Sequence, residues 1–81
     1  MSVSQAAVMG VVSKFIEHKK GLRPTVQPET ALLREGLLDS FALIELIAEL
    51  EKDLGLSLPD GSLIPEDFET PEVLYNRLLE I

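Results

Sequence analysis

Apolar residues recur along most of this chain at intervals of three and four, which is the spacing of one face of an α-helix. One such run covers residues 4–20 and ends before Gly21, which can adopt the left-handed conformation that closes a helix. A second run covers residues 40–54. A third begins at Thr70, a good N-cap, followed by Pro71, which suits the first helical position. The pattern therefore predicts three amphipathic helices.

The predicted helices are expected to bury their apolar faces against one another. Spacing assigns the following residues to this core: Val8, Val11, Val12, Phe15, Ile16, Leu43, Leu46, Ile47, Leu50, Leu54, Val73, Leu74, Leu78 and Ile81. Tyr75 is expected to be a partly buried aromatic residue of the last helix.

The connections between the helices have their own signals. Residues 21–38 contain two prolines and are predicted to form a long loop, in which residues 29–34 make one helical turn whose leucines contact the core. Residues 56–59 alternate between apolar and polar, but a single short strand without a partner cannot form a sheet. Residues 65–68 are predicted to form one helical turn with Phe68 pointing inward.

Taken together, the elements predict an all-α fold. It is a small helical bundle of three main helices plus one short helix, with a long loop between the first two helices. We expect a single domain that spans residues 1–81. Ser2 and Gln5 have the spacing of a capping box, and Asp60 followed by Gly61 is a turn signal.

The best place for chemistry is the Asp39-Ser40 pair at the start of the second helix. The first backbone N–H groups of a helix lack partners and the helix dipole is positive there, so a phosphate linked to the Ser40 hydroxyl would be stabilised. The same pair also fits ordinary helix capping. The surrounding sequence has to distinguish these interpretations.

Asp39-Ser40-Phe41, followed by Ile44-Glu45-Leu46 and Glu49-Leu50-Glu51, resembles the acyl carrier protein family. In that family the serine of the motif receives a 4′-phosphopantetheine arm, whose thiol carries an acyl or aminoacyl group as a thioester. The resemblance implies that Ser40 is the attachment residue. It also implies that Asp39 caps the helix and helps the modifying transferase to bind magnesium and recognise the serine. The chain itself would have no catalytic residue.

The segment before the last helix indicates which kind of carrier this is. Its acid-aromatic-x-Thr-Pro ending, within residues 63–71, looks like the D-alanyl carrier proteins and related stand-alone aminoacyl carriers. Ala42 stands where fatty-acid carriers often have an acidic residue, and Lys52 interrupts their usual acidic run. These features favour an aminoacyl carrier. A fatty-acid or polyketide acyl carrier protein is the alternative, and the identity of the cargo stays open.

Phe41, Ile44 and Ala48 form a second apolar strip along the second helix. The pattern alone fits additional core equally well. The resemblance implies instead that this strip, with Glu45 and Glu51, forms a docking face for partner proteins. A different class of function would be an unmodified helical adaptor that binds partners through Phe41 and Ile44.

The acidic residues are concentrated in one part of the chain. The net charge is −7, but residues 35–72 carry eleven Asp or Glu and one Lys. Such a surface would repel nucleic acid and anionic lipid, so we expect neither nucleic-acid binding nor membrane insertion, and basic protein surfaces are the natural partners. The resemblance implies three: a phosphopantetheinyl transferase, an adenylating acyl or aminoacyl ligase, and a downstream acyltransferase or synthase.

The chain contains no cysteine, lacks the layout of a secretion signal, and has no apolar stretch long enough to cross a bilayer. We therefore expect a cytoplasmic protein, and the resemblance implies a monomer. A serine hydrolase would need a base beside Ser40, but the only histidine is His18 on the first helix, and there is no Gly-x-Ser-x-Gly motif. No metal site is expected.

The remaining acidic residues near the end of the chain could suggest a cation site. They lack the spacing and the glycine of a calcium-binding loop. We expect them to be exposed acids that favour helix starts. They are Asp60, Glu66, Asp67 and Glu69.

Overall fold

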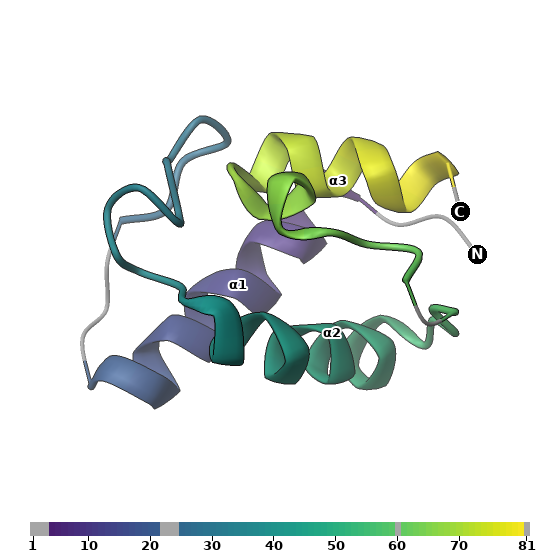
Figure 1. The fold of residues 1–81 in the computed structure, drawn as a ribbon, viewed down its shortest axis with the longest axis horizontal. Helices are drawn as coiled ribbons and strands as arrows, with labels where there is room; N and C mark the ends of the chain where they lie inside the picture. The colour runs from purple at the N-terminus through teal and green to yellow at the C-terminus, as the bar shows by residue number, and fades with distance from the viewer. Residues whose placement is uncertain (1–3, 22–24, 60, 81) are drawn as a thin grey trace.

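The computed structural model describes residues 4–21, 25–59 and 61–80. Within them lie the α-helices α1 (Gln5–Lys20), α2 (Ser40–Leu54) and α3 (Pro71–Glu80), and the short 3-10 helix η1 (Pro65–Phe68) (Figure 1). The described part of the chain contains no strand. The all-α prediction is confirmed, including the long loop between α1 and α2. None of these helices is long and apolar enough to cross a membrane.

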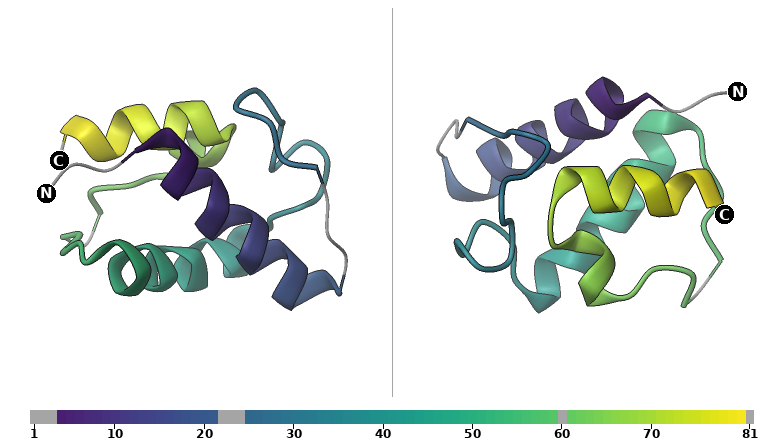
Figure 2. Two further views of the ribbon diagram at one scale, coloured as in Figure 1. Left: turned by 180° about the vertical axis from the view of Figure 1, so that it is seen from behind. Right: turned by 90° about the horizontal axis from the view of Figure 1, so that it is seen from above.

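The helix α1 packs against both α2 and α3, and η1 contacts α2 and α3 as well. Seen from behind, α1 runs diagonally across the other two helices, and the view from above places η1 on the opposite side of them (Figure 2). The loop between α1 and α2 lies beside the first residues of α2 and α3 (Figure 1). The loop therefore leads directly into the start of α2 and lies beside it.

Side-chain caps and glycines define the helix ends. Ser4 caps α1, because its Oγ accepts a hydrogen bond from the Ala7 amide at 3.1 Å. Thr70 caps α3 in the same way, as predicted. Gly21 ends α1 with φ 70°, the left-handed conformation that costs glycine little.

Three of the smaller predictions fall on residues outside the described ranges. The capping residue expected at Ser2 is one, and the structure uses Ser4 in its place. Asp60 of the predicted turn is another, although Gly61 beside it has φ 78°. The third is Ile81, expected to be the last core residue.

The core contains residues from every helix and from the loop. Leu32, in the turn predicted at residues 29–34, is fully buried, and its backbone N–H donates to the Glu69 carbonyl at 2.9 Å. Phe68 is also buried, as predicted. Ile47 and Leu54 were assigned to the core but only pack against its edge. Each fully buried leucine or phenylalanine stabilises the fold by about 1.5–3 kcal/mol.

Asp67 corrects the expectation of an exposed acid. It is only 7% exposed, and its Oδ2 accepts a hydrogen bond from the Ile64 amide at 3.0 Å. Its Oδ1 lies 3.1 Å from Nε of Arg77 in α3. A hydrogen bond to Glu80, together with the charge of Asp67, raises the pKa of Arg77. Asp67 is therefore a structural residue that joins η1 to α3.

Two other acids of this group are exposed, as expected. They are Glu66 in η1 and Glu69 directly after it. No group of acidic, histidine or cysteine residues in the described ranges is arranged to hold a metal ion. Asp60 lies outside those ranges.

Candidate functional site

The first turn of α2 presents Ser40. Asp39 is the N-cap: its Oδ1 accepts a hydrogen bond from the Ala42 amide at 2.8 Å, and its carbonyl accepts one from Leu43 at 3.1 Å. Capping fixes the extended backbone of Asp39 and starts the helix at Ser40. The predicted capping role of Asp39 is confirmed.

The residues just before this turn are fixed by burial and by backbone hydrogen bonds. Leu38 is 3% exposed, and the amides of Leu37 and Leu38 both donate to the Leu32 carbonyl, at 3.0 and 3.1 Å. Gly36 allows this tight turn because its φ is 73°. On the other side of Ser40, Leu43 is buried in the core. Buried leucines thus fix the backbone on both sides of an exposed serine.

Ser40 itself is exposed, and its hydroxyl makes no hydrogen bond to any described residue. The backbone amides of Ser40 and Phe41 also find no acceptor in the described ranges, as expected for the first positions of a helix. An oxygen-rich anionic group on the serine would meet these donors and the positive end of the helix dipole.

Among the described residues, none that lines the hollow at Ser40 could act as a base, and the neighbouring Asp39 carboxylate is engaged by the Ala42 amide. The hollow that begins at Ser40 has a volume of about 170 Å³, and it contains no titratable side chain. It is lined by Ser40, Leu43, Ile44, Ile47, Leu63, Ile64, Pro65 and Phe68. His18 lies on the exposed side of α1, beside a different hollow that it shares with Lys14 and Lys52. The arrangement suits a serine that is modified by another protein.

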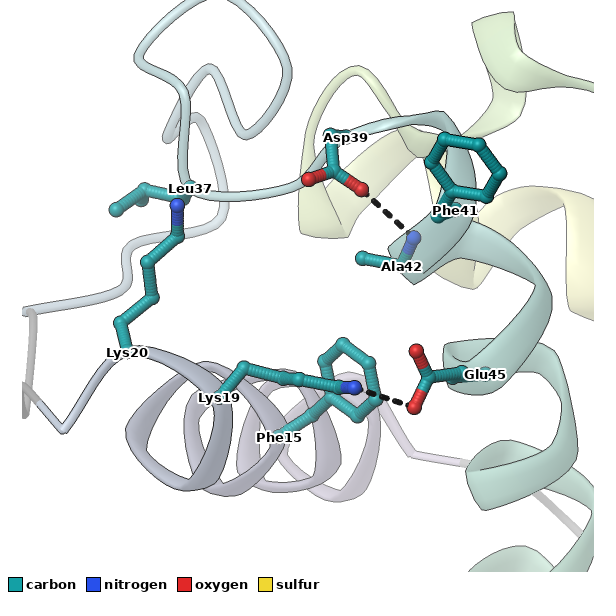
Figure 3. Close-up of a pocket in the computed structure, with 8 residues that line it drawn as sticks. All are labelled: Phe15, Lys19, Lys20, Leu37, Asp39, Phe41, Ala42 and Glu45. Atoms are coloured by element: carbon teal, nitrogen blue, oxygen red, sulfur yellow. Dashed lines mark hydrogen bonds and ion pairs between the residues drawn. The ribbon is translucent and has the colours of Figure 1, made fainter.

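On the other side of the α2 start lies a hollow of about 300 Å³, between α1 and α2 (Figure 3). Lys19 of α1 and Glu45 of α2 form an ion pair across it, and the Lys19 ammonium is 6.0 Å from the centre of the Phe15 ring. The sequence analysis assigned Glu45 to the docking face but did not predict its ion pair with Lys19. Glu45 is therefore an exposed acid whose charge is already partly balanced.

The apolar strip on α2 is at the surface. Phe41 is 83% and Ile44 is 70% exposed, and Ala48 is exposed as well. The interpretation of Phe41 and Ile44 as additional core is therefore wrong. Ile64, in the segment before η1, is 51% exposed and lines a hollow together with Ile44, so it extends the strip. Sequence analysis missed Ile64.

Glu51, the other acid assigned to the docking face, has a structural contact. Its Oε2 accepts a hydrogen bond from the Leu58 amide at 2.9 Å, which holds the extended segment after α2 in place. Glu51 is half-buried. Glu45 and Glu51 flank the strip on different sides, because Glu45 meets α1 and Glu51 meets the segment after α2.

Comparisons with known proteins identify the family of this chain. The sequence model of the family described as "Phosphopantetheine attachment site" matches residues 11–78. The chain is 33% identical to a D-alanyl carrier protein of Bacillus velezensis over 54 residues, which cover 67% of this chain and 69% of that protein. It is 37% identical to a D-alanyl carrier protein of Bacillus pumilus, with the same coverage.

A more distant relative broadens the comparison. The chain is 27% identical to the meromycolate extension acyl carrier protein of Mycobacterium leprae over 64 residues, 78% of this chain and 56% of that protein. No solved structure matches this chain. The relatives therefore include both a D-alanyl and an acyl carrier.

Proposed function

This chain belongs to the phosphopantetheine attachment site family, whose members carry 4′-phosphopantetheine covalently on a serine, and we propose that here the serine is Ser40. The observation that carries the proposal is the position of Ser40, which is exposed as the first residue of α2. Its hydroxyl has no hydrogen-bond partner among the described residues, and Asp39 caps the turn that presents it. The residues around it fit the group, because open space and unpaired amides adjoin the hydroxyl.

The other serines of the described ranges fit less well. The Ser4 hydroxyl is engaged in capping α1, Ser13 lies half-buried in the middle of α1, and the Ser62 hydroxyl is buried. Ser57 is exposed, but it follows the end of α2 and has neither a preceding aspartate nor a helix start. Ser57 is therefore a natural control for Ser40.

In the proposed modification, the Ser40 oxygen forms a bond to the β-phosphorus of coenzyme A and the phosphoanhydride bond breaks, releasing 3′,5′-ADP. Because the Asp39 carboxylate is engaged in capping the helix and none of the residues that line the hollow at Ser40 is a base, the transferase accepts the hydroxyl proton in this proposal. Asp39 holds Ser40 in position and helps the transferase to bind its magnesium. Once attached, the arm supplies a thiol that carries the cargo as a thioester.

The proposed carrier shuttles its cargo between an adenylating ligase and a downstream acyltransferase or synthase. Similarity to D-alanyl carrier proteins supports a D-alanyl or other aminoacyl cargo. Similarity to a meromycolate extension carrier keeps a fatty or polyketide acyl cargo as the alternative. Phe41, Ile44 and Ala48, flanked by Glu45, form the proposed docking face. The chain acts as one domain and as a monomer in the cytoplasm, and catalyses nothing itself.

Intact-mass measurement tests this function. The chain is incubated with coenzyme A and a phosphopantetheinyl transferase, and we expect the mass to rise by one phosphopantetheine. No added mass would overturn the carrier function and favour the unmodified adaptor. The modified chain is then offered D-alanine or a fatty acid, each with its ligase and ATP. Loading with the fatty acid alone would overturn the aminoacyl assignment.

A further inference from the structure

The ion pair between Lys19 of α1 and Glu45 of α2 crosses the space between the two helices, beside the start of α2 (Figure 3). Both side chains are open to solvent, since 38% of the Lys19 side chain and 52% of the Glu45 side chain are exposed. Water and salt weaken such a pair, which typically shifts an equilibrium by no more than about fivefold. Another cation can therefore displace Lys19 from Glu45.

Two hollows adjoin this ion pair. Lys19 and Glu45 line the hollow of about 300 Å³ that reaches Phe41, and they also line a hollow of about 340 Å³ that reaches Lys52. The Lys19 side chain is a flexible four-carbon stem with a compact charge at its end. The hollows leave space for this stem to move off Glu45, and for a cationic side chain of another protein to approach the carboxylate.

Glu45 flanks the proposed docking face and lies one helical turn after Phe41. Phe41 is 83% exposed and lines the first of the two hollows. A partner segment with an apolar side chain for Phe41 and a cation for Glu45 would complement both residues. In the free chain, however, the cation position at Glu45 is already occupied by Lys19.

We propose that Lys19 is an internal competitor for Glu45, which weakens the docking of basic partner segments by up to about fivefold. This rests on the docking face of the proposed function. A partner has to replace the Lys19 ammonium before its own cation can bind Glu45, so the net attraction is smaller than at an unpaired carboxylate. Weaker docking means faster release, which suits a carrier that binds several enzymes in turn. Lys19 is thus a residue that sets the affinity for partners.

A short basic peptide provides a direct test. The capped tripeptide Leu-Arg-Leu represents the partner segment, and capped Leu-Gln-Leu is its uncharged counterpart. Each is titrated into ¹⁵N-labelled chain at physiological salt, and its affinity is obtained from the amide signals of Phe41 and Glu45. We expect Lys19→Gln to bind Leu-Arg-Leu about two- to fivefold more tightly than the unaltered chain does. The affinity for Leu-Gln-Leu should be the same in both chains.

Lys20→Gln is the matched control. Lys20 follows Lys19 and lines the first hollow as well, but it forms no ion pair within the described ranges. Its removal changes the net charge by the same amount, so a clearly smaller gain in affinity is expected. A Glu45→Gln background completes the comparison. There, adding Lys19→Gln should leave the affinity unchanged, because no carboxylate remains to compete for.

The outcomes separate this inference from the proposed function. No added mass after incubation with coenzyme A and the transferase overturns the proposed function, while the peptide affinities still decide the role of Lys19. An unchanged or weaker affinity in Lys19→Gln overturns the inference alone, and so does an equal gain in Lys20→Gln. A gain that persists in the Glu45→Gln background would contradict competition for that carboxylate. Shifts that avoid Phe41 and Glu45 would also overturn the inference, because the peptide would then bind elsewhere.

Discussion

The start of α2 and the corner formed by η1 and α3 are both short turns that begin a helix, but they use their side chains differently. At the start of α2, Ser40 is exposed and Phe41 is 83% exposed. At the corner, Phe68 is 1% exposed and Asp67 is bonded to Ile64 and Arg77. One turn presents groups to other molecules and the other holds the chain together.

This difference predicts which substitutions will change the stability of the fold and which will not. A side chain that contacts little in the folded chain can be changed at small cost in stability. A buried aromatic ring or a bonded buried carboxylate cannot, because its loss leaves a cavity or unpaired groups. We therefore expect changes at the α2 start to alter modification, and changes at the corner to alter folding.

The largest predicted effect on stability is that of Phe68→Ala, and Phe41→Ala is its matched control. Phe68→Ala should lower the free energy of unfolding by about 3–5 kcal/mol, because it leaves a cavity in the core. Phe41→Ala should change it by less than about 0.5 kcal/mol, since the ring is exposed. Urea unfolding followed by circular dichroism measures both. Similar losses in the two variants would contradict the division between the turns.

A smaller effect should come from the helix caps. Asp39→Ala and Ser4→Ala each remove one side-chain cap and should each cost about 1 kcal/mol of stability. Only Asp39→Ala should also slow phosphopantetheine transfer, because Asp39 holds the turn that presents Ser40. Transfer rates are compared at a temperature where both variants are folded. Equal slowing in both would mean that Asp39 contributes nothing beyond capping.

Only a small effect on stability should come from Glu45. Its ion pair with Lys19 is at the surface, and such pairs contribute about 0–1 kcal/mol. Glu45→Lys should nevertheless slow transfer at low salt if basic partners dock beside Phe41, and added salt should reduce the difference. Glu51→Lys is a poorer probe, because it also removes the acceptor of the Leu58 amide. Transfer rates for Glu45→Lys that equal those of the unaltered chain at low salt would refute an electrostatic docking face.

The sequence predicted the helices well because helix periodicity and capping are local. The limits of α2 at Ser40 and Leu54, the Asp39 cap and the Thr70-Pro71 start of α3 all depend on residues a few positions apart. The burial of Phe68 followed from the same local pattern.

Contacts between distant residues could not be predicted in this way. The pairs Lys19–Glu45 and Asp67–Arg77 depend on how whole helices are placed, which periodicity does not specify. The sequence also left open whether Phe41 is buried. The apolar face of α2 is wide, and its pattern does not determine which part of it a neighbouring helix covers. In the structure α1 and η1 cover only the inner part of α2, and Phe41 stays outside.

The most direct test of the central claim compares two exposed serines at opposite ends of α2. Ser40→Ala and Ser57→Ala are each incubated with coenzyme A and the transferase, and their intact masses and melting temperatures are measured. We predict that Ser40→Ala gains no mass, Ser57→Ala gains one phosphopantetheine, and both melt like the unaltered chain. Addition that persists in Ser40→Ala would show that the arm is attached elsewhere.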